Sequence, residues 1–95
     1  MRKKEILNSL WAFRKKSGLS QKQVAFFLGQ KTSSQLSHYE RGTKFPGLAN
    51  ALKLEIIYHT PVAFLFYDLY QDLKKEIREK EKQVGQNDFG LKLLL

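Results

Sequence analysis

One two-part segment constrains the fold of this chain more than any other. Residues 19–29 read Leu-Ser-Gln-Lys-Gln-Val-Ala-Phe-Phe-Leu-Gly, and residues 37–42 read Ser-His-Tyr-Glu-Arg-Gly. Ser20 is a favourable helix N-cap, and Gln23 three residues later completes a capping box. A glycine closes each part, as glycine commonly does after the last turn of a helix. The segment therefore predicts two short helices joined by a tight turn.

The spacing of apolar residues predicts helices on both sides of this segment. The first includes Ile6 and Leu7 and ends at Gly18, after a last turn rich in cations. Another helix starts after the Pro-Gly pair at residues 46–47 and runs to Tyr58. The sequence contains no β-hairpin signal, so it predicts an all-α fold.

The last predicted helix is the longest one. The pair Thr60-Pro61 is typical of an N-cap followed by proline at the first helical position. From there the helical pattern continues from Val62 to about Val84. We therefore expect one uninterrupted helix over this range.

Packing is the expected role of most aromatic side chains, because they recur at core spacing on the predicted helices. Trp11, Phe27 and Tyr39 are expected in the core, and Phe26 and Phe45 at the surface. A set of stacking platforms for single-stranded nucleic acid is the weaker alternative.

The composition excludes several classes of site. A chain of 95 residues is long enough for one domain with a modest core. It contains no cysteine, and its two histidines, His38 and His59, belong to no metal-binding motif. We therefore expect no catalytic site, no metal site and no cofactor.

No apolar stretch approaches membrane-spanning length and the first residues do not resemble a signal peptide, so we expect a cytoplasmic protein without a membrane partner.

The charge of the chain is one-sided. The formal net charge is +8, and residues 1–46 hold ten Lys and Arg against two Glu. Residues 47–95 hold seven basic and seven acidic residues, so all the excess lies in the half with the two-helix segment. Such a charge asymmetry indicates a surface that binds a polyanion. The alternative, a charged surface that only keeps the protein soluble, would not explain why the positive charge is confined to one half of the chain.

Several residues at fixed spacing together resemble a known family. They are Arg14, the Gly-Leu-Ser-Gln run at 18–21, Val24-Ala25, Leu28-Gly29, the Ser-x-x-Glu-Arg-Gly pattern at 37–42, and Pro46. The combination is similar to the lambda-repressor/Cro-like (XRE) helix-turn-helix family over about residues 5–66. The resemblance implies a five-helix lambda-repressor-like DNA-binding domain in residues 1–66. It does not cover residues 67–95, which we expect to form a C-terminal helical extension and tail. It also implies a transcription regulator of prokaryotic or phage type.

The third predicted helix carries the candidate base-reading residues. Thr32 or Ser33 is expected to cap it, and its inward positions are Leu36 and Tyr39, so its other faces present polar side chains. By resemblance, Ser33, Ser34 and His38 are expected to contact bases, with Gln35 and Ser37 nearby. An ordinary solvated helix surface is the alternative interpretation.

Phosphate contacts are expected on both sides of that helix. The start of the second helix exposes unpaired backbone amides, and Gln21 adds side-chain donors there. Arg41 and Lys44 follow the third helix as expected phosphate clamps, and Lys31 in the turn is a further candidate. Double-stranded DNA is therefore the expected partner.

Glu40 requires a different interpretation, because phosphate would repel a carboxylate on a DNA-facing helix. The resemblance implies that Arg14 on the first helix pairs with Glu40 and ties the third helix to the scaffold. We expect this pair to have a structural role and leave it out of the DNA contacts.

The C-terminal extension carries the protein-partner hypothesis. Its seam residues recur at heptad spacing with one polar interruption, and they are Phe66, Tyr70, Leu73, Ile77, Lys80 and Val84. We expect this seam and the leucine-rich residues 91–95 to form a homodimer contact, although the seam could instead dock on the chain's own helices.

Two functions are consistent with such a chain. One is a repressor that binds a palindromic operator as a dimer. The alternative is an antitoxin or accessory protein whose C-terminal helix binds another protein, with autoregulatory DNA binding.

Overall fold

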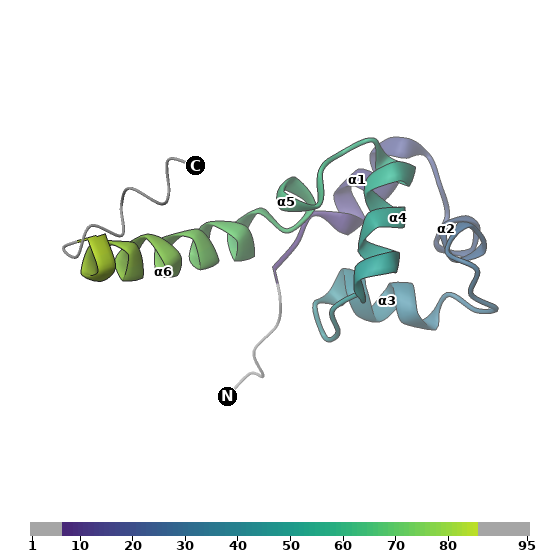
Figure 1. Ribbon diagram of the computed structural model, residues 1–95. Coiled ribbons are helices and arrows are strands. Elements are labelled where there is room, and N and C mark those ends of the chain that lie inside the picture. The colour runs from purple at the N-terminus through teal and green to yellow at the C-terminus, as the bar shows by residue number, and fades with distance from the viewer. Residues whose placement is uncertain (1–6, 86–95) are drawn as a thin grey trace, which may run out of the picture.

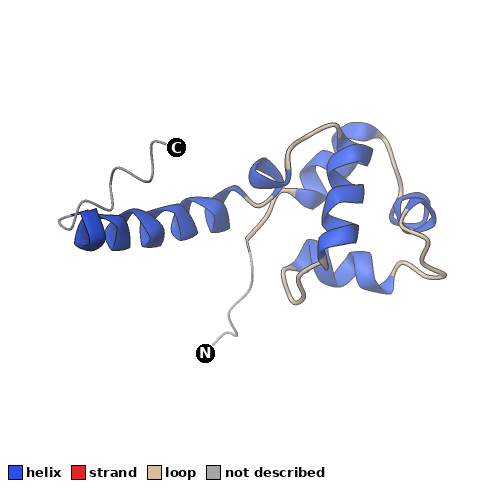
Figure 2. Cartoon of the chain, viewed as in Figure 1, coloured by secondary structure: helices blue, strands red, loops and turns tan. Residues whose placement is uncertain are grey.

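Five short helices pack around one apolar core, and a sixth helix projects away from them (Figure 1). The computed structural model describes residues 7–85. In chain order its helices are α1 (Leu10–Ser17), α2 (Gln21–Phe27), α3 (Ser34–Arg41), α4 (Leu48–Tyr58), α5 (Val62–Leu65) and α6 (Tyr67–Gly85). No strand occurs among these residues (Figure 2), which confirms the predicted all-α class with a C-terminal helical extension.

Each of the first five helices contributes one side chain that is fully buried. These core residues are Leu10, Val24, Leu36, Leu54 and Leu65. Full burial of an aliphatic side chain of this size contributes about 1.5–3 kcal/mol before the entropy of ordering is subtracted. The core thus depends on all five helices together, which explains how elements of only 4 to 11 residues are held in place.

Helix α2 starts with the predicted capping box. The Ser20 hydroxyl accepts a hydrogen bond from the Gln23 amide at 3.0 Å, and the Gln23 side chain accepts one from the Ser20 amide at 2.8 Å. Gly29, with φ of +78°, turns the chain after the end of α2, and Gly42, with φ of +77°, ends α3. The two-helix unit therefore has the capping box and the glycine stops that the sequence predicts. At the start of α3, Ser33 occupies the N-cap without a side-chain cap bond, and the Thr32 hydroxyl accepts a hydrogen bond from the Ser34 amide at 3.3 Å.

The first helix starts later than expected. It begins at Leu10 and leaves Leu7 outside the helix and exposed, while Ile6 lies outside the described residues. The Asn8 side-chain oxygen accepts a hydrogen bond from the Leu10 amide at 2.9 Å, so Asn8 holds a first-turn donor of the helix.

The expectation of one uninterrupted helix from Val62 to Val84 was wrong. Phe66 leaves the helical conformation, with φ of −121° and ψ of +51°, and separates α5 from α6. The Leu65 carbonyl accepts a hydrogen bond from the Ser9 amide at 2.8 Å, and the Phe66 side chain is buried in the core. Tertiary contacts with the start of α1 therefore break the helix and remove Phe66 from the exposed seam.

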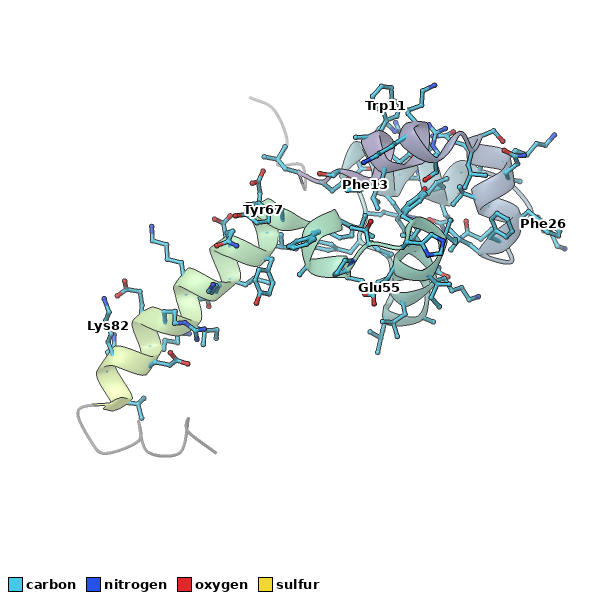
Figure 3. All side chains as sticks on the ribbon, turned by 90° about the horizontal axis from the view of Figure 1, so that it is seen from above. Trp11, Phe13, Phe26, Glu55, Tyr67 and Lys82 are labelled. Atoms are coloured by element: carbon cyan, nitrogen blue, oxygen red, sulfur yellow. The ribbon has the colours of Figure 1, made fainter. Side chains whose placement is uncertain are left out.

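Thr60 does not cap α5 as the sequence suggested. Its hydroxyl donates to the Tyr58 carbonyl at 2.9 Å, and the helix starts at Val62. The Glu55 side chain accepts a hydrogen bond from the Val62 amide at 3.0 Å and so caps α5 from α4. Figure 3 shows Glu55 on α4 among the helices of the globular part.

Two aromatic residues expected in the core lie at the surface. Trp11 is 57% exposed and Phe27 is 54% exposed, and Figure 3 shows Trp11 at the outer side of α1. Lys15 lies over the Trp11 ring at 5.7 Å, a cation–π contact that an exposed ring permits. Tyr39 is buried and Phe26 and Phe45 are exposed, as predicted.

Candidate nucleic-acid interface

A buried ion pair joins the first three helices behind the polar face of α3. Arg14 Nε donates to Glu40 at 2.6 Å, and Arg14 Nη2 donates to the other carboxylate oxygen at 3.2 Å. The two side chains are only 9% and 4% exposed. Arg14 also donates to the Leu19 carbonyl at 3.0 Å, and the side-chain Nε2 of Gln21 donates to Glu40 at 3.0 Å. The predicted Arg14–Glu40 pair is confirmed, and it connects α1, α2 and α3.

The Arg14 guanidinium keeps its charge despite being buried. The hydrogen bond to Glu40 raises the pKa of Arg14 above its ordinary value, although burial acts in the opposite direction. Each carboxylate oxygen of Glu40 accepts at least one hydrogen bond from Arg14 or Gln21. A buried carboxylate is stable only when it is paired in this way, so the network fixes where α3 lies relative to α2.

Tyr58 lies near this pair and gives it a measurable signature. Burial raises the pKa of Tyr58 to about 12, and the negative charge of Glu40 acts in the same direction. The pKa of Tyr58 is thus higher in the folded protein than in the unfolded chain, where it is about 10. The free energy of unfolding therefore has its full value below about pH 10 and decreases as the pH rises towards 12. We expect the tyrosinate absorbance of the folded protein to show a late step near pH 12 that is missing in Tyr58→Phe.

The same comparison tests stability. In urea titrations the free energy of unfolding of the wild type should fall more steeply between about pH 10 and 12 than that of Tyr58→Phe. The Tyr58 hydroxyl makes no hydrogen bond within residues 7–85, so its removal should not destabilise the protein at neutral pH. Parallel stability curves for the two proteins in this range would contradict the assignment.

Helix α3 presents a polar face opposite its buried side. Leu36 and Tyr39 point into the core, and Asn50 donates to the Tyr39 hydroxyl at 3.1 Å. The predicted base-reading residues lie at the start of α3 and on its outer face. Ser34 and Gln35 are exposed, and Ser33, Ser37 and His38 are half-buried.

The end of α3 carries a contact network that sequence reasoning missed. His38 Nδ1 lies 2.8 Å from the Thr43 hydroxyl and 3.5 Å from Arg41 Nη2. Arg41 Nε also donates to the Ser37 carbonyl at 3.3 Å. Sequence periodicity places Thr43 only in a loop, because a residue after a helix-stopping glycine lies outside the helical period. Its position directly after Gly42, five residues from His38, is the only sequence signal for this contact.

The expected phosphate contacts lie around this face. Gln21 is half-buried at the first turn of α2, and its bond to Glu40 places it beside the end of α3. Arg41 and Lys44 are exposed at the end of α3 and in the following loop. Lys31 is exposed and lines one hollow together with Lys22 and Ser33, so the turn before α3 is cationic as well.

No group of three or more His, Cys, Asp or Glu that could hold a metal ion occurs within residues 7–85. In the same range no helix is long and apolar enough to cross a membrane.

Comparison with known proteins agrees with the geometry. A search of curated proteins found no match. A family model described as helix-turn-helix (HTH_3) matches residues 12–65, from the third residue of α1 to the last residue of α5. Helix α6 lies outside the match. Because the match covers more than half of the chain, the protein belongs to the HTH_3 helix-turn-helix family, of the XRE type, as its resemblance to lambda-repressor/Cro-like domains implied.

Proposed function

We propose that the protein is a sequence-specific transcription regulator that binds double-stranded DNA. The observation that carries the proposal is the polar outer face of α3, held rigidly by the Arg14–Glu40 network within a helix-turn-helix domain. A helix held in this way fits the DNA major groove, where each base pair presents a distinct set of donors and acceptors.

The proposed base contacts are short and polar. Ser33, Ser34 and His38 are the principal candidates, with Gln35 and Ser37 beside them. Gln35 is able to bind adenine through two hydrogen bonds, whereas a serine hydroxyl accepts or donates to several bases. This side-chain set gives modest direct discrimination, so the remaining specificity comes from the shape and deformability of the operator.

The proposed phosphate contacts surround the helix. Arg41 and Lys44 follow it, Lys31 precedes it and Gln21 lies at the first turn of α2. Arg41 is held along α3 by its bond to the Ser37 carbonyl, which restricts the guanidinium to the end of the helix. Cations in these places supply the sequence-independent and salt-sensitive part of the affinity.

The phosphate contacts have a direct test. Arg41→Ala and Lys44→Ala should each weaken binding to every duplex and reduce the slope of log affinity against log salt by about 1. Fluorescence anisotropy with an operator duplex and a scrambled duplex at several salt concentrations measures both quantities. Lys75→Ala on the outside of α6 serves as the matched control and should leave the slope unchanged.

We further propose that the protein acts as a dimeric repressor on a palindromic operator. The support is the exposed apolar stripe of Tyr70, Leu73, Ile77 and Val84 on α6, a helix that extends beyond the globular part (Figure 1). A single domain reads few base pairs, and pairing two of them on half-sites multiplies the specificity. Selecting bound sequences from a random duplex pool tests this directly, because a dimer selects inverted repeats.

The same helix also supports the alternative function. An apolar groove of about 260 Å³ lies between the loop before α4, α5 and the start of α6, and its lining includes Phe45, Val62 and Leu73. The groove continues into the α6 stripe, so a helix of another protein would have an apolar surface to bind. An antitoxin or accessory protein of this type would remain monomeric alone and form a complex with its partner.

A further inference from the structure

The exposed apolar stripe of α6 has two unlike halves. At the start of the helix, Tyr70 and Leu73 line the apolar groove together with Phe45 from the loop before α4. The same two residues line a second hollow farther along α6 with Ile77, so the groove and the stripe form one continuous surface. The last turns of α6, which carry Val84, lie away from the globular part (Figure 1). The stripe is therefore concave at its start and convex at its free end.

These halves complement each other only when two copies of α6 run in opposite directions. In a parallel pair the same positions meet, so groove faces groove and Lys80 meets its own copy inside the seam, where like charges repel. In an antiparallel pair the free end of each helix lies at the groove of the other copy. Residues 67–85 hold five acidic and five basic residues, so two copies of α6 approach without net repulsion.

The seam residues define a register for the antiparallel pair. When the pair is centred between Leu73 and Ile77, Leu73 of each copy packs against Ile77 of the other. Tyr70 then meets Lys80 of the other copy, and the Lys80 side chain, which is 67% exposed, is free to place its ammonium over the ring. This register buries the apolar centre of the stripe and gives its one polar residue a favourable partner.

We infer that the groove receives the free end of α6 from a second copy of the chain, and that the two α6 helices pair antiparallel. In this register Val84 of one copy comes level with Phe66 of the other, whose side chain lines the groove. Each copy contributes one groove and one helix end, so the contact is self-complementary and closes as a dimer. The inference rests on the proposed dimer and names what fills the groove.

The first test uses engineered thiols, because the chain contains no cysteine of its own. In the antiparallel pair the two copies of position 80 lie about 15 Å apart along the axis, at about 1.5 Å per residue, which is too far for a disulfide. Lys80→Cys alone should therefore not form linked dimers. Tagged Lys80→Cys mixed with untagged Tyr70→Cys in reducing buffer and then oxidised should give the mixed dimer on a non-reducing gel. Lys75→Cys on the outside of α6 is the control for random collisions and should not cross-link.

The second test measures whether the groove is occupied. Val84→Gln at the helix end and Phe45→Gln at the groove should each raise the dissociation constant of the dimer by about tenfold, since each removes one apolar contact. Both together should raise it little more than either alone, because they remove the same contact. Ile56→Gln is the matched control, being 70% exposed on α4 outside the groove, and it should leave the constant unchanged. Sedimentation velocity at several concentrations gives these values.

The outcomes separate this inference from the proposed function. Disulfide-linked dimers of Lys80→Cys alone would overturn the antiparallel pairing and leave the proposed DNA-binding dimer standing. A Phe45→Gln protein that dimerises as tightly as the wild type would overturn the groove as the contact site. A monomeric wild type would overturn the inference and the proposed dimer together, and would leave the groove to another protein or to residues 86–95 of the same chain. Binding of the wild type to duplex DNA is measured separately and does not depend on either result.

Discussion

Glu40→Ala is expected to lower the free energy of unfolding by about 3–5 kcal/mol, because it leaves the buried Arg14 cation without its partner. A small domain has only about 5–15 kcal/mol of total stability, so the loss is a large fraction of it. Urea unfolding followed by circular dichroism measures the change. The same variant should weaken DNA binding strongly, since α3 loses its attachment to α1 and α2.

The chain provides a matched control for this prediction. Glu76 pairs with Lys80 on the exposed surface of α6 at 3.6 Å, and both side chains are more than half exposed. Glu76→Ala should cost less than about 1 kcal/mol, because solvent screens an exposed pair and its ordering costs entropy. Replacing Arg14 and Glu40 together by leucine should recover part of the loss, since neither charge is then left unpaired. A Glu40→Ala protein as stable as Glu76→Ala would contradict the role assigned to the buried pair.

The local features of the fold could be predicted because their causes lie within a few residues. The capping box at Ser20 and the glycine stops at Gly18 and Gly42 depend on backbone geometry that neighbouring residues determine. The Arg14–Glu40 pair joins two different helices, and it could be predicted only because the motif resembles a family that contains such a pair. Burial of Leu36 and Tyr39 followed from helical spacing alone.

Features decided by distant contacts could not be predicted. Phe66 breaks the last helix because Ser9, far away in sequence, takes the Leu65 carbonyl. Trp11 has the spacing of a core residue, but no other helix within residues 7–85 covers that side of α1, so the ring stays exposed. The contact between Thr43 and His38 depends on how the chain turns after Gly42, which no periodicity encodes.

The paired substitution Leu73→Gln with Ile77→Gln is expected to convert the protein to a monomer and to reduce its affinity for a palindromic operator by at least about 100-fold. These residues are 50% and 51% exposed on the α6 stripe, so glutamine removes the apolar contact without opening the core. Glutamine retains helix propensity and net charge, which keeps the electrostatic part of DNA binding unchanged. Loss of the second half-site removes the gain of tethering, which is about 10²–10⁴ in affinity.

Point substitutions separate the dimer contact from folding better than a truncation does. A chain that ended at Tyr67 would also lose Leu69, which packs against the core. The control is Leu48→Gln with Ile56→Gln on α4, which are even more exposed apolar residues outside the stripe. Sedimentation velocity gives the oligomeric state, and anisotropy with one-half-site and two-half-site duplexes gives the affinities.

The pattern of results identifies the interface. If the dimer contact lies on α6, the α6 variant should be monomeric and should keep its affinity for a single half-site. The α4 control should then remain dimeric. Loss of the dimer in the α4 control alone would place the contact on α4. A wild type that is already monomeric would show that no second copy of the chain covers the α6 stripe. The partner-binding alternative would then account for the exposed apolar residues of the stripe better than a homodimer does.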